Sequence, residues 1–225
     1  MTSFSIDIPE PASFKASQAS FFDLQADTVL HRIHSGRFGP IEFNATNLGD
    51  ARFSPISTPD GLIIPTIYAA ETFECAVSET ILRSPDFEPI DPMTGARVSI
   101  AIRPHKWRAS VHSTLQTLQD LHLVDLTTQG QRRLGIDRNA LLAGPTMTYP
   151  TTRAWAEAVH AGCPDAHGLY YTSHQFGPKF AIMLFGDRVP DAVQEILPQR
   201  SVSHPDCDRK IRALAQTFGF SYEDL

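Results

Sequence analysis

The chain has 225 residues, with 42% hydrophobic and 20% charged residues. Its length favours a single domain, and its hydrophobic content excludes a chain that is disordered throughout. The 19 basic and 25 acidic residues give a formal net charge of −6, so direct binding to nucleic acid or to an anionic membrane is not expected.

The N-terminal segment and the cysteines indicate a cytoplasmic protein. Residues 1–16 contain acids and two prolines, and they lack the apolar core of a signal peptide. No apolar run approaches the roughly 18 residues that a membrane helix needs. Cys75, Cys163 and Cys207 show no paired spacing, so we expect no disulfide framework and a reducing compartment.

Strand and helix patterns alternate along the first half of the chain. Residues 1–20 are polar and are expected to form an arm or a short leading helix. Apolar and β-branched residues predict strands at 28–34 and 62–68, although Pro65 suggests an edge, a bulge or a later start for the second strand. Apolar residues at helical spacing then predict a helix over 70–82.

The second half continues this mixed pattern. Alternating polarity predicts half-buried strands at 97–103 and 122–127. The spacing of Leu115, Leu118 and Leu121 indicates one or two helical turns before the later strand. The remaining expected elements are helices at 137–143, 151–161 and 208–220 and a hairpin of strands at 167–173 and 179–185.

These elements predict a single α+β domain with five or six strands and short helices between them. Side-chain capping supports the helix boundaries. Thr72 is a plausible N-cap for the helix over 70–82, and Thr151 or Thr152 can cap the helix over 151–161. No linker separates the chain into two domains.

Two clusters of side chains have the composition of metal sites but not the spacing. His31 and His34 lie three residues apart in an expected strand, which points them to opposite faces. His160, Cys163 and His167 span a helix end without an evident further ligand. We therefore expect no metal site, and keep a metal-dependent hydrolase built on the second cluster as an alternative.

Several short motifs occur in a fixed order along the chain. They are Leu30-His-Arg-Ile, Ala51-Arg-Phe-Ser-Pro, Ile67-Tyr-Ala-Ala, Ala76-Val-Ser-Glu79, Arg153-Ala-Trp155 and Gly168-Leu-Tyr-Tyr-Thr-Ser173. In this order the motifs resemble the RES domain family, which includes the toxins of Xre–RES toxin–antitoxin systems, and the resemblance covers about residues 28–190. The loop between Arg52 and Tyr68 is longer than in a typical member.

The resemblance implies a fold similar to ADP-ribosyltransferases, with a curved, split β-sheet, flanking short helices and a cleft for NAD⁺. It implies cleavage of the nicotinamide–ribose bond by water or phosphate, with NAD⁺ as substrate and no further cofactor. An Xre-type antitoxin protein is the implied partner. We expect an N-terminal arm at 1–27, a RES-like catalytic domain at 28–190, and a C-terminal extension at 191–225 whose amphipathic helix packs on the domain.

The resemblance also implies roles for individual residues. Glu79 would stabilise positive charge on the ribose or hold its 2′-hydroxyl, and Arg52 and Arg32 would hold the pyrophosphate. Tyr68 would stack on nicotinamide or donate through its hydroxyl, and Ser173 would bond the nicotinamide amide or the ribose. The expected catalytic residues are Glu79, Arg52, Tyr68 and Ser173, and the expected substrate-binding residues are Arg32, Tyr171 and His174.

The residue types alone leave other interpretations open. Glu79 also fits a solvated helix glutamate, Arg52 a surface arginine, and Tyr68 a core aromatic at a strand end. An ADP-ribosyltransferase that modifies a protein acceptor would use the same cleft. A non-catalytic RES-like binding module would keep the scaffold and lack the chemistry.

Overall fold

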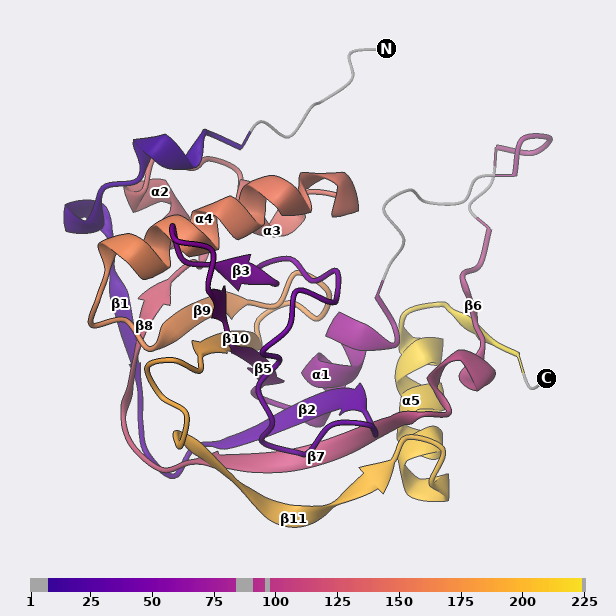
Figure 1. The fold of residues 1–225 in the computed structure, drawn as a ribbon. Coiled ribbons are helices and arrows are strands. Elements are labelled where there is room, and N and C mark those ends of the chain that lie inside the picture. Colours follow the sequence, from indigo (N-terminus) through magenta and orange to yellow (C-terminus); the bar gives the residue numbers. More distant parts are fainter. Residues whose placement is uncertain (1–7, 84–90, 96–97, 224–225) are drawn as a thin grey trace.

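A curled sheet of eight strands forms the centre of the computed structural model, which describes residues 8–83, 91–95 and 98–223 (Figure 1). The strand order is β1-β8-β9-β10-β5-β2-β7-β11, and all neighbours are antiparallel except β8 and β9. The predicted α+β class with a curved sheet is confirmed. The strands are β1 (Phe21–Leu24), β2 (Val29–Ser35), β5 (Thr66–Ala70), β7 (Ser110–Thr117), β8 (Leu121–Asp125), β9 (Gly168–Thr172), β10 (Phe180–Phe185) and β11 (Val193–Ser201).

Short helices and two small sheets surround this curled sheet. In Figure 1, α2, α3 and α4 lie together on one side of the molecule, and α1 and α5 lie beside each other near β2 and β7. The α-helices are α1 (Phe73–Thr80), α2 (Thr128–Arg133), α3 (Ala140–Ala143), α4 (Tyr149–Gly162) and α5 (Pro205–Thr217). The small sheets pair β3 (Ile56–Ser57) with β4 (Ile63–Ile64) and β6 (Ala101–Ile102) with β12 (Ser221–Tyr222). The 3₁₀ helices are η1 (Pro11–Ser13), η2 (Ala16–Gln18), η3 (Pro104–Trp107) and η4 (Thr146–Thr148).

Strand β10, in the middle of the sheet, is buried on both faces. Ala181, Met183 and Phe185 belong to the larger core. Ile182 and Leu184 alternate with them and belong to a second core on the opposite face. A strand that is covered on both sides reads as a continuous apolar run, which explains the recognisable pattern at 179–185.

Several sequence predictions are confirmed. The strand expected at 28–34 is β2, and the hairpin expected in the later half is β9 with β10. Thr72 caps α1, because its hydroxyl accepts a hydrogen bond from the Cys75 N–H at 3.1 Å. The expected C-terminal amphipathic helix is α5. Among the helices of the described segments, none has the length and apolar composition that a membrane span requires.

The helical turns expected from three leucines are wrong. Leu115 lies in β7, Leu118 is exposed in the following turn, and Leu121 begins β8. Strand β7 pairs with all of β2, from Val29 opposite Gln116 to Ser35 opposite Ser110. The three leucines are spaced three residues apart because they lie in a strand, a turn and a second strand. The two strands bury Leu115 and Leu121 in the same core.

Three other boundaries differ from expectation. Within 97–103 only Ala101–Ile102 form a strand, which pairs with β12 outside the main sheet, and 96–97 lie outside the described residues. Pro65 separates β4 from β5, so the second strand starts later. Helix α4 begins at Tyr149, and Thr152 lies inside it, where its hydroxyl donates to backbone carbonyls.

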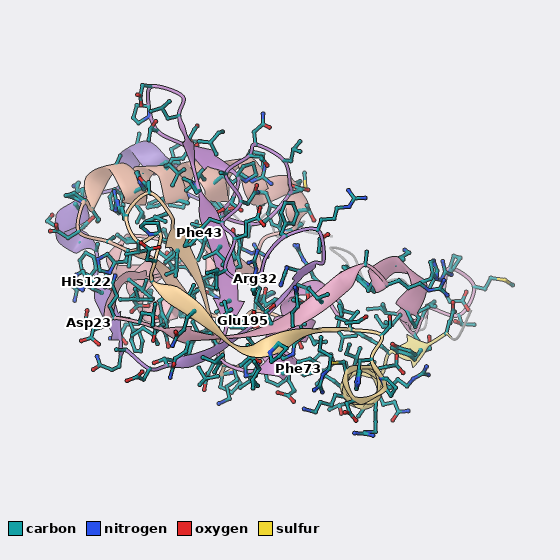
Figure 2. The ribbon with its side chains drawn as sticks, turned by 60° about the horizontal axis from the view of Figure 1, so that its bottom comes forward. Asp23, Arg32, Phe43, Phe73, His122 and Glu195 are labelled. Atoms are coloured by element: carbon teal, nitrogen blue, oxygen red, sulfur yellow. The ribbon has the colours of Figure 1, made fainter. Side chains whose placement is uncertain are left out.

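The sheet also contains strands that the sequence did not reveal. Within the segment expected as an arm, Phe21–Leu24 form the edge strand β1. Asp23 lies opposite His122 of β8, and their side chains pair at 2.6 Å (Figure 2). At the other edge, β11 pairs with β7 through two register shifts. Helix α2 was also not predicted.

Candidate active site

A cavity of about 550 Å³ opens between β2, β5, α1 and the loop that precedes β3. Its volume is within the range of small-molecule sites. Five of the seven expected site residues line it: Arg32, Arg52, Tyr68, Glu79 and Tyr171. These residues come from strands, a helix and a loop that are far apart in sequence, and the sheet brings them to one place.

The carboxylate of Glu79 is held by the turn that follows β9. Glu79 lies in the last turn of α1, and its Oε1 accepts a short hydrogen bond from the Ser173 hydroxyl. The Gln175 N–H approaches the same oxygen at 3.5 Å. Ser173 is 2% exposed and does not line the cavity. Ser173 therefore orients the Glu79 carboxylate from a buried position outside the cavity lining.

The guanidinium of Arg52 is fixed where α3 ends and α4 begins. Its Nη1 donates to the carbonyl oxygens of Leu141 and Gly144, both at 3.1 Å. Its Cζ lies 5.1 Å from the ring centre of Tyr149, a favourable cation–π distance. These contacts give a charged group in a loop a defined orientation at the cavity wall.

Arg32 holds a loop at the cavity wall. From β2, its Nη1 donates to the carbonyls of Pro40 at 2.9 Å and Glu42 at 3.1 Å, with Gly39 at 3.4 Å. Burial lowers the pKa of Arg32 to about 10, against the raising effect of Glu42. The side chain therefore stays charged at neutral pH. The guanidinium of Arg32, a charged group in a strand, is thus hydrogen-bonded to backbone carbonyls.

Two tyrosines form an apolar wall whose hydroxyls stay protonated. The Tyr68 hydroxyl accepts from the Phe53 N–H at 3.1 Å, and burial raises the pKa of Tyr68 to about 12. Tyr171 is 6% exposed, and its ring packs edge-on against Phe53 with centroids 5.4 Å apart. Burial also raises the pKa of Tyr171 well above its ordinary value.

His174 differs from the other expected residues. It is exposed and does not line the cavity. Partial desolvation and the nearby charge of Arg52 lower its pKa, whereas Glu79 acts in the opposite direction. The structure therefore places His174 close to the arginine and the carboxylate, but outside the cavity lining.

Sequence reasoning missed Tyr149 and Arg83, which also line the cavity. Guanidinium carbons of Arg83 and Arg153 lie 5.0 and 5.9 Å from the Tyr149 ring centre, in addition to that of Arg52. Within the described part of the chain, the buried Tyr149 hydroxyl has no hydrogen-bond partner. Arg153 pairs with Asp50. Positive charge therefore collects at the Tyr149 end of the cavity.

The side chains of His160, Cys163 and His167 do not point to a common centre where a metal ion could bind. His160 Nε2 pairs with Asp187 at 2.9 Å, and His167 Nδ1 accepts from the His122 N–H at 3.1 Å. Cys163 is buried. Throughout the ranges that the structure describes, no group of three histidine, cysteine, aspartate or glutamate side chains is arranged to hold a metal ion.

The first histidine pair likewise has protein partners. His31 Nδ1 lies 3.0 Å from His112 Nε2, and His34 Nε2 lies 2.9 Å from the Ser113 hydroxyl. Both His31 and His34 line the cavity. Their ring nitrogens form hydrogen bonds within the sheet, between β2 and β7.

Comparisons with known proteins give one family. The RES domain model matches residues 29–209, which is most of the chain and includes every expected site residue. A search of curated proteins finds no match. On the extent of the family match, the chain belongs to the RES domain family.

Proposed function

We propose that this protein degrades NAD⁺ by cleaving the nicotinamide–ribose bond, with water or phosphate as acceptor. One observation carries the proposal: a cavity of about 550 Å³ is lined by the Glu79 carboxylate, three tyrosines and several arginines. Membership of the RES domain family supports the same substrate class. NAD⁺ is the substrate, and no further cofactor is needed.

Glu79 supplies the electrostatic part of the proposed chemistry. Nicotinamide leaves as a neutral molecule from a cationic ring, so positive charge develops on the ribose in the transition state. A carboxylate beside the ribose stabilises that charge, or holds the 2′-hydroxyl in place. The bond from Ser173 fixes the carboxylate before the substrate arrives, and such preorganisation is worth most in a site that excludes water.

The arginine end of the cavity suits the pyrophosphate. The guanidinium carbons of Arg52 and Arg83 both lie close to the centre of the Tyr149 ring, at 5.1 and 5.0 Å. A planar guanidinium can present two N–H groups to a phosphate. In this arrangement Arg52 and Arg83 bind the phosphates directly. Arg32 contributes positive potential and holds the loop at Gly39–Glu42 through its carbonyl bonds.

The tyrosines complete the proposed binding mode. Tyr68 and Tyr171 offer neutral aromatic surface, because burial raises both pKa values. Tyr68 therefore stacks on the nicotinamide or donates its hydroxyl proton. His174 lies near Arg52 and Glu79 but outside the cavity lining. We therefore assign His174 to the entrance of the cavity, where it contacts NAD⁺ only while the substrate enters or the products leave.

The catalytic role of Glu79 is tested by measuring nicotinamide release from NAD⁺ by the wild type, Glu79→Gln and Glu74→Gln. Glu74 lies in the same helix but does not line the cavity. We expect Glu79→Gln to lower kcat by about 100-fold or more, and Glu74→Gln to stay within about twofold of the wild type, because Glu74 lies outside the cavity lining. Equal activity of wild type and Glu79→Gln would refute the assignment.

The biological role that fits this chemistry is that of a toxin in the cytoplasm, where depletion of NAD⁺ arrests growth and an Xre-type antitoxin blocks the cleft. The proposed catalytic part is 28–190, with an arm at 1–27 and an extension at 191–225. If radiolabel from NAD⁺ appears on protein, an ADP-ribosyltransferase is favoured. If NAD⁺ binds without turnover, a binding module is favoured.

A further inference from the structure

The turn that carries Ser173 packs against the end of the C-terminal helix. The rings of Phe176 and Phe218 meet edge to face, with centroids 6.3 Å apart. Phe218 makes a second such contact with Phe220 at 5.7 Å. All three rings are half-buried and pack against the larger core. An aromatic contact of this kind contributes about 0.5–1.5 kcal/mol beyond the area that it buries.

The same turn sets the direction of the Ser173 proton. The Phe176 N–H donates to the Ser173 hydroxyl oxygen at 3.0 Å, and that hydroxyl donates its single proton to Glu79. Because one lone pair of Ser173 is taken by Phe176, the hydroxyl has less freedom to rotate. The place of the Phe176 backbone therefore decides how well Ser173 holds the carboxylate.

Phe218 is itself held by a well-anchored segment. Ile211 and Ala215 of α5 are 2% and 0% exposed in the larger core. After the helix, the Phe220 N–H bonds back to the Ala215 carbonyl at 2.9 Å, and the Ser221 N–H donates to Ile100 at 3.0 Å. The family match ends at residue 209, so Phe218 lies beyond the part of the chain that the family model covers.

We propose that Phe218 is a positioning residue for the Glu79–Ser173 pair, and that it acts through Phe176. The C-terminal segment thus completes the site without touching substrate. The catalytic consequence rests on the proposed NAD⁺ cleavage. Loss of the ring leaves a gap beside Phe176, the turn shifts, and the carboxylate loses its fixed orientation. A misplacement of about 1 Å in a catalytic group costs up to about 100-fold in rate.

Three variants separate positioning from general stability. Phe218→Ala removes the ring, Phe218→Leu restores most of the apolar volume, and Tyr222→Ala removes a ring from the same segment. Tyr222 contacts α5 through Arg212, at 4.2 Å, and Asp208, at 2.7 Å. Both alanine variants lose an aromatic ring that packs near α5, but only Phe218→Ala loses the ring contact with Phe176.

Each variant is examined by amide hydrogen exchange at Phe176 and by kcat and KM for nicotinamide release. For Phe218→Ala we expect faster exchange of the Phe176 amide, a fall in kcat of about 10-fold and a KM within about twofold. Phe218→Leu should recover most of both losses. Tyr222→Ala should leave both close to the wild type at a temperature where it is folded.

Amide exchange tests the inference about Phe218, and nicotinamide release tests the proposed function, so each can fail without the other. Unchanged exchange at Phe176 in Phe218→Ala overturns the inference, whatever the activity. Equal losses in Phe218→Ala and Tyr222→Ala also overturn it, because they indicate general destabilisation. A wild type that releases no nicotinamide refutes the proposed function, while the exchange data still decide whether Phe218 positions the turn.

Discussion

The cavity around Glu79 and the C-terminal end of α4 both gather charged side chains, yet they differ in what those side chains face. Glu79, Arg32 and Arg52 line an open volume of about 550 Å³. At the end of α4, Arg188 instead donates to the carbonyls of Cys163 at 2.8 Å and Ala166 at 2.6 Å, and also to that of His160.

The difference teaches how to separate a binding site from a structural cluster. The last carbonyls of a helix have no partner inside the helix, and a basic side chain can satisfy them. Arg188 does this for α4, while His160 pairs with Asp187. In the cavity, protein contacts orient the charged groups at the edge of an open volume. The His160, Cys163 and His167 pattern in the sequence thus reflects a helix end.

After the loss of Glu79 itself, we expect the largest fall in activity at the cavity from Ser173→Ala. The substitution removes the hydroxyl that orients the carboxylate, so kcat should fall by about 10- to 100-fold with a smaller change in KM. Steady-state nicotinamide release measures both constants. A substitution that alters only KM would contradict the orienting role and indicate a direct contact between Ser173 and the substrate.

A smaller effect is expected from Arg52→Lys. Lysine keeps the charge but loses the planar fork and its stacking on Tyr149, so KM for NAD⁺ should rise by about 10-fold and kcat should change less. Arg37→Lys, at an exposed position in the loop after β2, is the matched control. If both variants have the KM of the wild type, Arg52 does not bind the pyrophosphate.

At the other region, Arg188→Ala should affect stability and not chemistry. It leaves carbonyls at the end of α4 without their donor, so the free energy of unfolding should fall by about 1–3 kcal/mol. Urea denaturation measures that change, and nicotinamide release per folded molecule should equal that of the wild type. A loss of turnover in fully folded Arg188→Ala would erase the distinction between the two regions.

Acid should destabilise the sheet through two half-buried histidines, His34 and His112. Burial, and then the charge of Arg32, lower the pKa of His34 to about 4, and burial followed by the charge of His31 lowers that of His112 to about 4. Because these folded-state values lie below the ordinary value of 6.5, the unfolded chain binds more protons. Stability should therefore fall as the pH drops from about 6.5 towards 4. Because both rings are partly exposed and solvent screens their charge, the loss at pH 5 should be on the order of 1 kcal/mol per histidine.

Denaturation curves of the wild type and His112→Gln between pH 7 and pH 5 test this dependence. The variant has one titrating group fewer, so its stability should change less over this interval. A pH dependence in His112→Gln as steep as that of the wild type, or steeper, would show that His112 is not a source of the acid sensitivity.

Local patterns predicted the elements that carry apolar residues at a regular period, and failed where pairing alone makes a strand. Strand β10 and helix α5 carry apolar residues at the right period, so both were found. Strand β11 is exposed along almost its whole length and contains Pro198. It is a strand because β7 offers a free edge, and that information is not local.

The site divides in the same way. Arg52, Tyr68 and Glu79 lie in short motifs that the sequence displays, and the cavity brings them together. Tyr149 begins a helix and Arg83 follows another, and neither belongs to a motif. The contact between the Arg83 guanidinium and the Tyr149 ring joins two segments that are far apart in the sequence, which periodicity does not encode. Neither the contact from Phe218 to Phe176 nor its consequence for Ser173 has a local signal in the sequence.

The most direct test of the central claim is a proton NMR time course of NAD⁺ with the purified wild-type protein, in buffers with and without phosphate. We expect the signals of free nicotinamide to grow as those of NAD⁺ decline. The co-product should be ADP-ribose if water is the acceptor, and ADP-ribose 1-phosphate if phosphate is. Unchanged NAD⁺ in both buffers, with protein shown by circular dichroism to be folded, would contradict the assignment of this cavity to NAD⁺ cleavage.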